Sequence, residues 1–590
     1  MKRVAWIFAA VLLSALALFA LLVALVPREA LKAQIGEQIA SWTGRDVSLR
    51  GEPEISIFPA LRVILNDVHV GGPEGMDDAE ILSMDRLTGT VRLLPLLIGR
   101  IEVGSYTMVR PLVRLVRDAE GRRNWDFDSG AAALQLAFQG DVPLGDFTLE
   151  GGTVVYEDRQ SGGNERIDSV SLAIDWPSVR QPIAVDGTGI WRGEQVTVSV
   201  DANAPFAFLN GGSTPLETRV EAAPISAIFS GQADDYPLPK LGGALKLSTP
   251  SLRRFVSWLG SPLGPGSTLG QASGFGTASF DGNGLSVESA EFTLDGNDAS
   301  GALNIALSPK LDITGTLAFN ALDISPYFAG LAAMMSTTTD WRRVALLTDW
   351  FGTMNSDIRL SASTVRLGEL TASDAAASVS LRDGRLEVGL ARAIFGGGSL
   401  TGNLAMTDSA NASEAAVEAQ LRANDIAFAL AASTLGLPQA ISGTASVLVD
   451  VSTRGTDLGS LVGELSGTAR LSVKDGAVPL FGLADVAAAA GGPANPLPAE
   501  GLAATAVNSA SAGFSFSGGV GMLQRANVVA PSYSADMQGW IGLLDGTLGL
   551  NGTLKPGAVG SIASPATAPV GFTIDGTLAA PVAHPVTPAQ

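Results

Sequence analysis

The chain has 590 residues, of which 46% are hydrophobic and only 16% charged, with 69 glycines and no cysteine. This composition excludes a disordered chain and a disulfide scaffold, and the lack of cysteine also excludes thiol catalysis and cysteine-ligated zinc. The formal net charge is −20, and the acidic excess lies beyond residue 125. A body of this charge cannot hold polyphosphate by electrostatic attraction, so we expect no nucleic-acid binding.

The first predicted element is an apolar segment at residues 4–26, which follows a short basic stretch at residues 1–3. It contains no charged residue and is long enough to cross a hydrocarbon core of about 30 Å as a helix. Because Lys2 and Arg3 precede it, the positive-inside rule places residues 1–3 in the cytoplasm and the rest of the chain across the membrane. A cleaved signal peptide is the alternative, but this apolar run exceeds a normal signal-peptide core. We therefore predict a retained single-pass anchor.

An amphipathic helix is predicted next, at residues 27–44, with a proline at its start and a glycine as its stop signal. Leu31, Ile35, Ile39 and Trp42 recur along one stripe at helical spacing. Two interpretations stay open. The stripe lies on the outer leaflet or at a lipid entrance, or it packs onto the first strands, which is the commoner use of such a stripe.

The remainder of the chain has the pattern of β-strands joined by short turns. Apolar and polar residues alternate in many places, which puts the apolar ones on one face of each strand. Three apolar trios mark this face: Val196, Val198 and Val200; Leu303, Ile305 and Leu307; and Leu386, Val388 and Leu390.

Turn signals and one slip in the alternation refine this prediction. Asp-Gly pairs fit tight hairpin turns, so we expect neighbouring strands to be antiparallel and the sheet to be a meander. Near Asn66-Asp67 the alternation slips by one residue, which predicts a β-bulge. The Asp-Gly pairs are Asp186-Gly187, Asp281-Gly282, Asp295-Gly296, Asp383-Gly384, Asp475-Gly476, Asp545-Gly546 and Asp575-Gly576.

We divide the β body into regions 45–127, 128–326 and 352–580. Residues 327–351, which carry Met and Trp among other apolar side chains, are predicted to be a helical insertion between the last two regions. Residues 581–590 form a Pro-rich tail that we expect to hang away from the body.

The fold class follows from what these one-sided strands pack against. With few helices to cover the apolar faces, either the sheet folds on itself as a sandwich, or it curves into a trough with an apolar lining. We expect a mainly β protein: an N-terminal transmembrane helix, then an elongated, twisted antiparallel β-sheet trough with short helical insertions.

Signatures of catalysis are missing from the sequence. The two histidines are His69, inside a strand pattern, and His584, in the Pro-rich tail, and neither belongs to a catalytic triad or a zinc motif. There is no Walker A loop and no GxSxG serine turn. We expect no enzyme, no cofactor and no metal.

Several short motifs occur in a specific order near the N-terminus. They are Thr43-Gly44-Arg45, Phe58-Pro59, Leu94-Pro95-Leu96-Leu97-Ile98-Gly99, Arg110-Pro111 and Gly121-Arg122-Arg123-Asn124-Trp125. Together these motifs, within residues 43–127, resemble the AsmA family. A looser similarity to the family's C-terminal β region runs from residue 341 to residue 576. The middle of the chain is similar only in its general residue pattern and has no matching motif.

The resemblance implies an inner-membrane-anchored protein that faces the periplasm of a Gram-negative envelope and is related to chorein-type bridge-like lipid-transfer proteins. It implies a β groove with an apolar floor, for which the three trios are the candidate lining, and phospholipid and the inner membrane as partners, with other envelope proteins as further candidates. The implied role is support of outer-membrane assembly and lipid homeostasis. The alternative is a membrane-anchored β scaffold that influences targeting or insertion of outer-membrane proteins.

Overall fold

The computed structural model describes residues 45–56, 61–73, 76, 80–91, 103–125, 143–234, 239–260, 268–306, 310–328, 341–346, 348, 351–352, 354–408, 414–427, 429–430, 442–478, 486, 497–498, 505–556, 569–578 and 580–586. The predicted anchor at 4–26 and the predicted helix at 27–44 lie outside these residues. Within them, no helix combines the length and the apolar character needed to cross a membrane.

The chain is mainly β, as predicted, and it divides into two compact units. Unit 1 covers residues 1–249 and 277–282, and unit 2 covers residues 250–276 and 283–590. The division falls within β14 (Ala272–Phe280).

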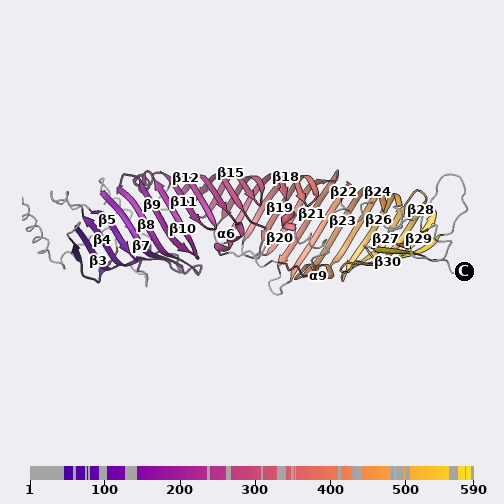
Figure 1. The fold of residues 1–590 in the computed structure, drawn as a ribbon, viewed down its shortest axis with the longest axis horizontal. Helices are drawn as coiled ribbons and strands as arrows, with labels where there is room; N and C mark the ends of the chain where they lie inside the picture. The colour runs from indigo at the N-terminus through magenta and orange to yellow at the C-terminus, as the bar shows by residue number, and fades with distance from the viewer. Residues whose placement is uncertain are drawn as a thin grey trace, which may run out of the picture. The chain divides into compact units, whose positions relative to one another are not determined.

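Unit 1 is built from strands that lie side by side (Figure 1). Most neighbours pair in an antiparallel way, as β8 does with β9 and β12 with β13. Its elements are β1 (Val47–Leu49), β2 (Glu54–Ser56), β3 (Leu61–Val70), β4 (Leu82–Val91), β5 (Val103–Val109), β6 (Leu112–Arg117), β7 (Pro143–Asp158), β8 (Gly163–Ser178), β9 (Ile183–Trp191), β10 (Glu194–Ala202), α5 (Pro205–Leu209), β11 (Thr214–Ala222), β12 (Ile225–Asp234) and β13 (Lys240–Thr249).

Unit 2 is also built from strands that lie side by side (Figure 1). Its described helices are short: α6 (Leu252–Trp258), η1 (Ser325–Phe328), η2 (Trp341–Arg343) and α9 (Leu458–Gly463). Its strands are β15 (Gly284–Leu294), β16 (Asn297–Ala306), β17 (Asp312–Asp323), β18 (Asn355–Leu367), β19 (Leu370–Arg382), β20 (Arg385–Phe395), β21 (Gly398–Asp408), β22 (Ala415–Ala427), β23 (Ser442–Gly455), β24 (Ser466–Val478), β25 (Leu497–Pro498), β26 (Thr505–Ser517), β27 (Val520–Val529), β28 (Tyr533–Gly542), β29 (Thr547–Pro556), β30 (Val570–Thr577) and β31 (Ala580–Val586).

The expectation of a simple meander is wrong at two places. Strands β5 and β6 pair with β7 in parallel, and so does β17 with β18. In each case the chain between the paired strands is long, so it can return to the starting edge before the next strand begins, which a tight turn cannot do. The connection between β17 and β18 contains the predicted insertion at 327–351. The described residues of this insertion include η2 and part of η1, which are short 3₁₀ turns.

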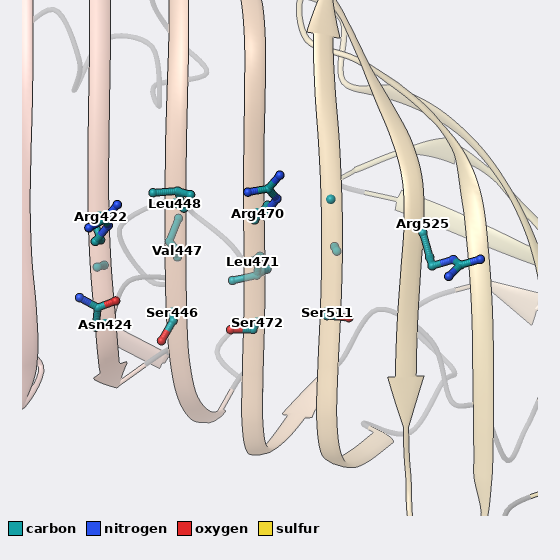
Figure 2. A pocket seen from close by; sticks show the side chains of 13 residues that line it. Arg422, Asn424, Ser446, Val447, Leu448, Arg470, Leu471, Ser472, Ser511 and Arg525 are labelled. Carbon is teal, nitrogen blue, oxygen red and sulfur yellow. The ribbon is translucent and has the colours of Figure 1, made fainter.

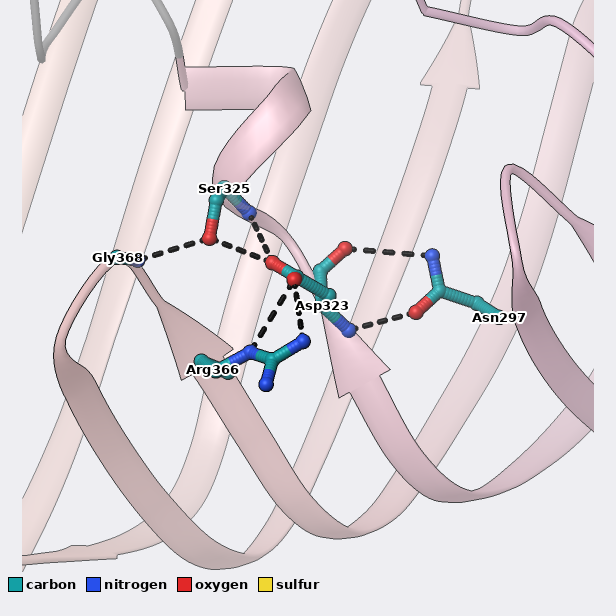
Figure 3. Close-up of polar contacts among 5 residues, drawn as sticks. All are labelled: Asn297, Asp323, Ser325, Arg366 and Gly368. Atoms are coloured by element: carbon teal, nitrogen blue, oxygen red, sulfur yellow. Dashed lines mark hydrogen bonds and ion pairs between the residues drawn. The ribbon is translucent and has the colours of Figure 1, made fainter.

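A polar clamp holds the second parallel junction together (Figure 3). The backbone N–H of Asp323, the last residue of β17, donates to Asn297 Oδ1 on β16 at 2.6 Å. The Asp323 carboxylate accepts from Arg366 Nη2 on β18 at 2.7 Å and from the Ser325 backbone N–H at 2.9 Å. Ser325 Oγ in turn accepts from the Gly368 N–H at 2.8 Å. Three strands and η1 are therefore tied through one residue, Asp323, by its backbone N–H and its carboxylate together.

The Asp-Gly pairs fulfil two different roles. Four of them lie between consecutive strands, as Asp383-Gly384 does between β19 and β20, with φ of 49° and 77°. Asp186-Gly187, Asp475-Gly476 and Asp575-Gly576 instead lie inside β9, β24 and β30, so the hairpin prediction is wrong for these three. At Gly187 the reason is space, because an added Cβ would come within 2.4 Å of Leu172 Cδ2.

The predicted slip near Asn66-Asp67 is present, but it is not a bulge on one strand. Leu65 and Val68 both belong to one buried cluster with Met84, so the phase of the side chains does change between them. The register of β3 against β4 nevertheless stays constant, with Leu65 opposite Leu87 and Val68 opposite Met84. The side-chain phase therefore changes in both strands at the same level, and the backbone of Asp67 adopts a φ of 54° at this point.

The predicted free tail is also corrected. Residues Ala580–Val586 form β31, which pairs with β30 along its length, for example Phe572 with Pro585. Proline is tolerated in a strand where its missing N–H faces away from a partner. Residues 587–590 lie outside the described part of the chain.

Candidate functional site

The β10 trio lies on a face that continues onto both neighbouring strands. Val196, Val198 and Val200 are all half-buried. Val198 is directly opposite Gly187 on β9 and Val220 on β11. Because directly opposite residues share a face of the sheet, Val198 and Val220 lie side by side on it, and Gly187 continues the same face onto β9.

The β16 residues repeat this arrangement in unit 2. Leu303 and Ile305 are half-buried, and Leu307 lies outside the described residues. Ile305 is opposite Leu285 on β15 and Ile313 on β17. The apolar face of β16 is therefore shared by its neighbours on both sides.

The β20 trio is flanked in the same way. Leu386, Val388 and Leu390 are half-buried. Val388 is opposite Val379 on β19 and Leu404 on β21. The described members of the three trios thus lie opposite partners on both adjacent strands that are mostly apolar residues or glycine.

The other face of these strands is polar and open to water. Thr197, Asn304 and Glu387, which neighbour the central residues of the three trios, are exposed. A sealed sandwich would bury the trios, yet each described member keeps part of its surface accessible. The arrangement is an amphipathic sheet with an apolar face that still has room for contact with an apolar ligand.

One part of unit 2 has its apolar face filled by its own side chains. A large buried cluster spans β26 to β31 and includes Phe572, Ile574 and Leu554, each 2% exposed. Gly552 leaves room for the Phe572 ring, since an added Cβ would lie 2.2 Å from Phe572 Cζ. Here the protein forms an ordinary hydrophobic core from its own side chains.

The N-terminal motif residues have structural roles. Asn124 is fully buried, where its Nδ2 donates to the Arg114 carbonyl at 2.8 Å and its Oδ1 accepts from the Val116 N–H at 2.9 Å. Its own carbonyl accepts from Arg45 Nη2 at 3.5 Å, so the TGR motif and the GxxNW motif meet. Asn124 thereby supplies β6 with partners that a strand would otherwise provide.

Comparison with known proteins places the chain by family. The AsmA family model matches residues 1–338 and 334–524. The match includes the middle of the chain, where the sequence is similar to the family only in its general residue pattern. No curated protein and no solved structure matches the sequence significantly. With more than half of its length covered by these matches, the chain belongs to the AsmA family.

Proposed function

We propose that this protein carries phospholipid acyl chains along its apolar β face and so supports outer-membrane assembly and lipid homeostasis from an inner-membrane anchor. The observation that carries the proposal is the accessibility of the trios: eight apolar side chains, three on β10 of unit 1 and five on β16 and β20 of unit 2, are half-buried and none of them is buried as a core. The proposed role is binding and transport, not catalysis. The predicted anchor at 4–26 supports placing the body in the periplasm.

Acyl chains are suited to such a surface. Each methylene group removed from water contributes about 0.8 kcal/mol, so even partial coverage of a long chain gives useful affinity. No hydrogen-bond donors are needed along the floor, because an acyl chain offers none. The headgroup would remain in water.

The direct test is photo-crosslinking in intact cells. A photoreactive phenylalanine analogue replaces Val198, Ile305 or Val388, and the purified full-length protein is analysed by mass spectrometry for covalently attached lipid. Controls carry the analogue one residue away, at Thr197, Asn304 or Glu387, on the exposed polar face. Lipid adducts at the first set and not at the second support the proposal. Equal labelling on both faces, or none on either, would contradict it.

Charge substitution separates a lipid surface from a protein scaffold. We expect Val198→Asp, Ile305→Asp and Val388→Asp each to cost about 1–3 kcal/mol, because water still reaches these half-buried positions. The variants should therefore accumulate and resist protease, yet lose bound lipid and leave the outer membrane permeable. Thr197→Asp and Asn304→Asp are the matched controls and should behave as the unaltered protein. Loss of the protein at all three sites would favour sealed faces and the scaffold role.

A further inference from the structure

A pocket lies on the polar face of unit 2, across strands β22, β23, β24, β26 and β27 (Figure 2). It has a volume of about 490 Å³. One row of its lining residues is set by strand register, with each member directly opposite the next: Arg422, Leu448, Arg470, Gly513 and Arg525.

The register also fixes which face this is. Directly opposite residues share a face, and successive residues alternate, so this row points away from Ala423 and Leu471. Those two residues belong to a hydrophobic cluster on the apolar face. The pocket is therefore separate from the surface proposed to carry acyl chains.

The three arginines of the row form no ion pair with the residues that the structure describes. All three are exposed, and within the described residues none of them takes part in an ion pair or a side-chain hydrogen bond. Some other arginines of unit 2 do have an ion-pair partner, as Arg385 has in Glu418 at 3.2 Å. In a chain of net charge −20, three unpaired arginines in one pocket concentrate positive charge where an anion can bind.

Asp536, whose carboxylate interacts electrostatically with Arg525, is already engaged by other donors. Asp536 accepts from Lys555 at 2.9 Å and from Asn527 Nδ2 at 3.0 Å. These bonds, more than the nearby Arg525, hold the pKa of Asp536 below its usual value. The donors of Arg525 are thus left for another partner.

Gly513 leaves open space between Arg470 and Arg525. A Cβ added to Gly513 would meet nothing within 4 Å. The flanking arginines stand two strands apart, about 10 Å between Cα atoms, a gap that their long side chains can close around a tetrahedral oxyanion. Ser472 and Ser511, opposite one another and two residues along from Arg470 and Gly513, add hydroxyl donors.

We propose that this pocket binds a phosphate group, with Arg470 and Arg525 on either side of Gly513 and the two serine hydroxyls beside them. The phosphate belongs either to a phospholipid headgroup or to a small soluble phosphate ester. The inference does not depend on the acyl-chain role, because the two surfaces lie on opposite faces. Loss of lipid from the apolar face would leave phosphate binding intact.

The test is a binding titration on the full-length protein in a neutral detergent. Inorganic phosphate, glycerol 3-phosphate and dihexanoylphosphatidylglycerol are titrated separately and followed by calorimetry. Arg470→Gln and Arg525→Gln should each weaken binding by about tenfold, the usual effect of losing one charge-assisted hydrogen-bonding partner. Gly513→Val, which fills the gap without changing charge, should also weaken it.

The matched control is Arg454→Gln. Arg454 is exposed on β23 and lies six residues from Leu448, about 20 Å along the strand and outside the pocket. It should leave affinity within twofold. Arginine-dependent binding of all three probes identifies a site for soluble phosphates, and such binding of phosphatidylglycerol alone identifies a headgroup site. If no probe binds in a way that depends on Arg470 and Arg525, the proposal is wrong.

Discussion

At the scale of single residues, His69 is held between two carboxylates. Its Nε2 lies 2.7 Å from Asp67 Oδ1, and its Nδ1 contacts Glu80. Burial disfavours the charged ring, but the hydrogen bonds to Glu80 and Asp67 outweigh it and raise the pKa of His69. Glu80 lies two residues before β4, so the protonated ring links β3 to the segment that leads into β4.

We expect His69→Gln to lower the stability of the β1–β4 region by about 1 kcal/mol at acidic pH, since both carboxylates are partly exposed and their attraction is screened. Because the folded pKa is raised, the contribution of His69 is complete below the unfolded pKa of about 6.5 and is lost as pH rises through the folded value. Hydrogen exchange of β3 and β4 should thus differ between variant and unaltered protein at about pH 5.5 and converge at higher pH. A difference independent of pH would argue against the charged bridge. His584→Gln, in unit 2, controls for loss of an imidazole.

At the scale of elements, close strand packing depends on particular glycines. On β13, a Cβ added to Gly243 would lie 2.4 Å from the Ser230 carbonyl oxygen and 2.5 Å from Gly231 Cα, both backbone atoms of β12. A Cβ added to the adjacent Gly242 would meet nothing within 4 Å. A side chain should therefore be excluded at Gly243 and tolerated at Gly242, so the two positions can be compared directly.

Gly243→Ala should destabilise the β12–β13 pair by about 1–3 kcal/mol, because the backbone of β12 must shift to accept the methyl group. Gly242→Ala should be neutral or stabilising by up to about 1 kcal/mol, since it reduces the freedom of the unfolded chain. Hydrogen exchange resolved to β12 and β13 measures both. Equal effects of the two substitutions would show that the contact with β12 is not limiting.

The clamp at Asp323 decides whether β17 and β18 stay paired at their ends. Hydrogen bonds from Ser325, followed by those from Arg366, lower the pKa of Asp323 to about 2. Its contribution is therefore present above the unfolded pKa and is lost as pH falls through about 2. We expect Asp323→Asn to speed hydrogen exchange at the β17–β18 end at neutral pH, whereas Asp312→Asn, at the other end of β17, should not. Unchanged exchange in Asp323→Asn would mean that strand pairing alone holds the junction.

At the scale of the whole molecule, the proposed role requires the body to lie outside the cytoplasm. A reporter enzyme active only in the periplasm should work when fused after residue 590 and not when fused before residue 1. The protein should remain with the membrane fraction after washing at high salt. Recovery of a soluble form with a new N-terminus near residue 28 would replace the anchor with a cleaved signal peptide.

The β class, the apolar face and most strands follow from the sequence, because period-two alternation is a local property of each strand. The trios at 196–200 and 386–390 lie where alternation placed them, and so do the described members of the third. The motifs at 43–127 also indicated the family correctly, since their order is specific even though each motif alone is weak.

The tertiary structure decided what depends on contacts between distant segments. Alternation cannot distinguish Asp383-Gly384, which turns a hairpin, from Asp186-Gly187, whose glycine makes room for Leu172 on another strand. Nor can it show that β17 and β18 are parallel, because the direction of a strand depends on the path of the chain before it. The arginine pocket illustrates this most clearly. Arg422, Arg470 and Arg525 are far apart in the sequence, and only the register of five strands brings them into one row.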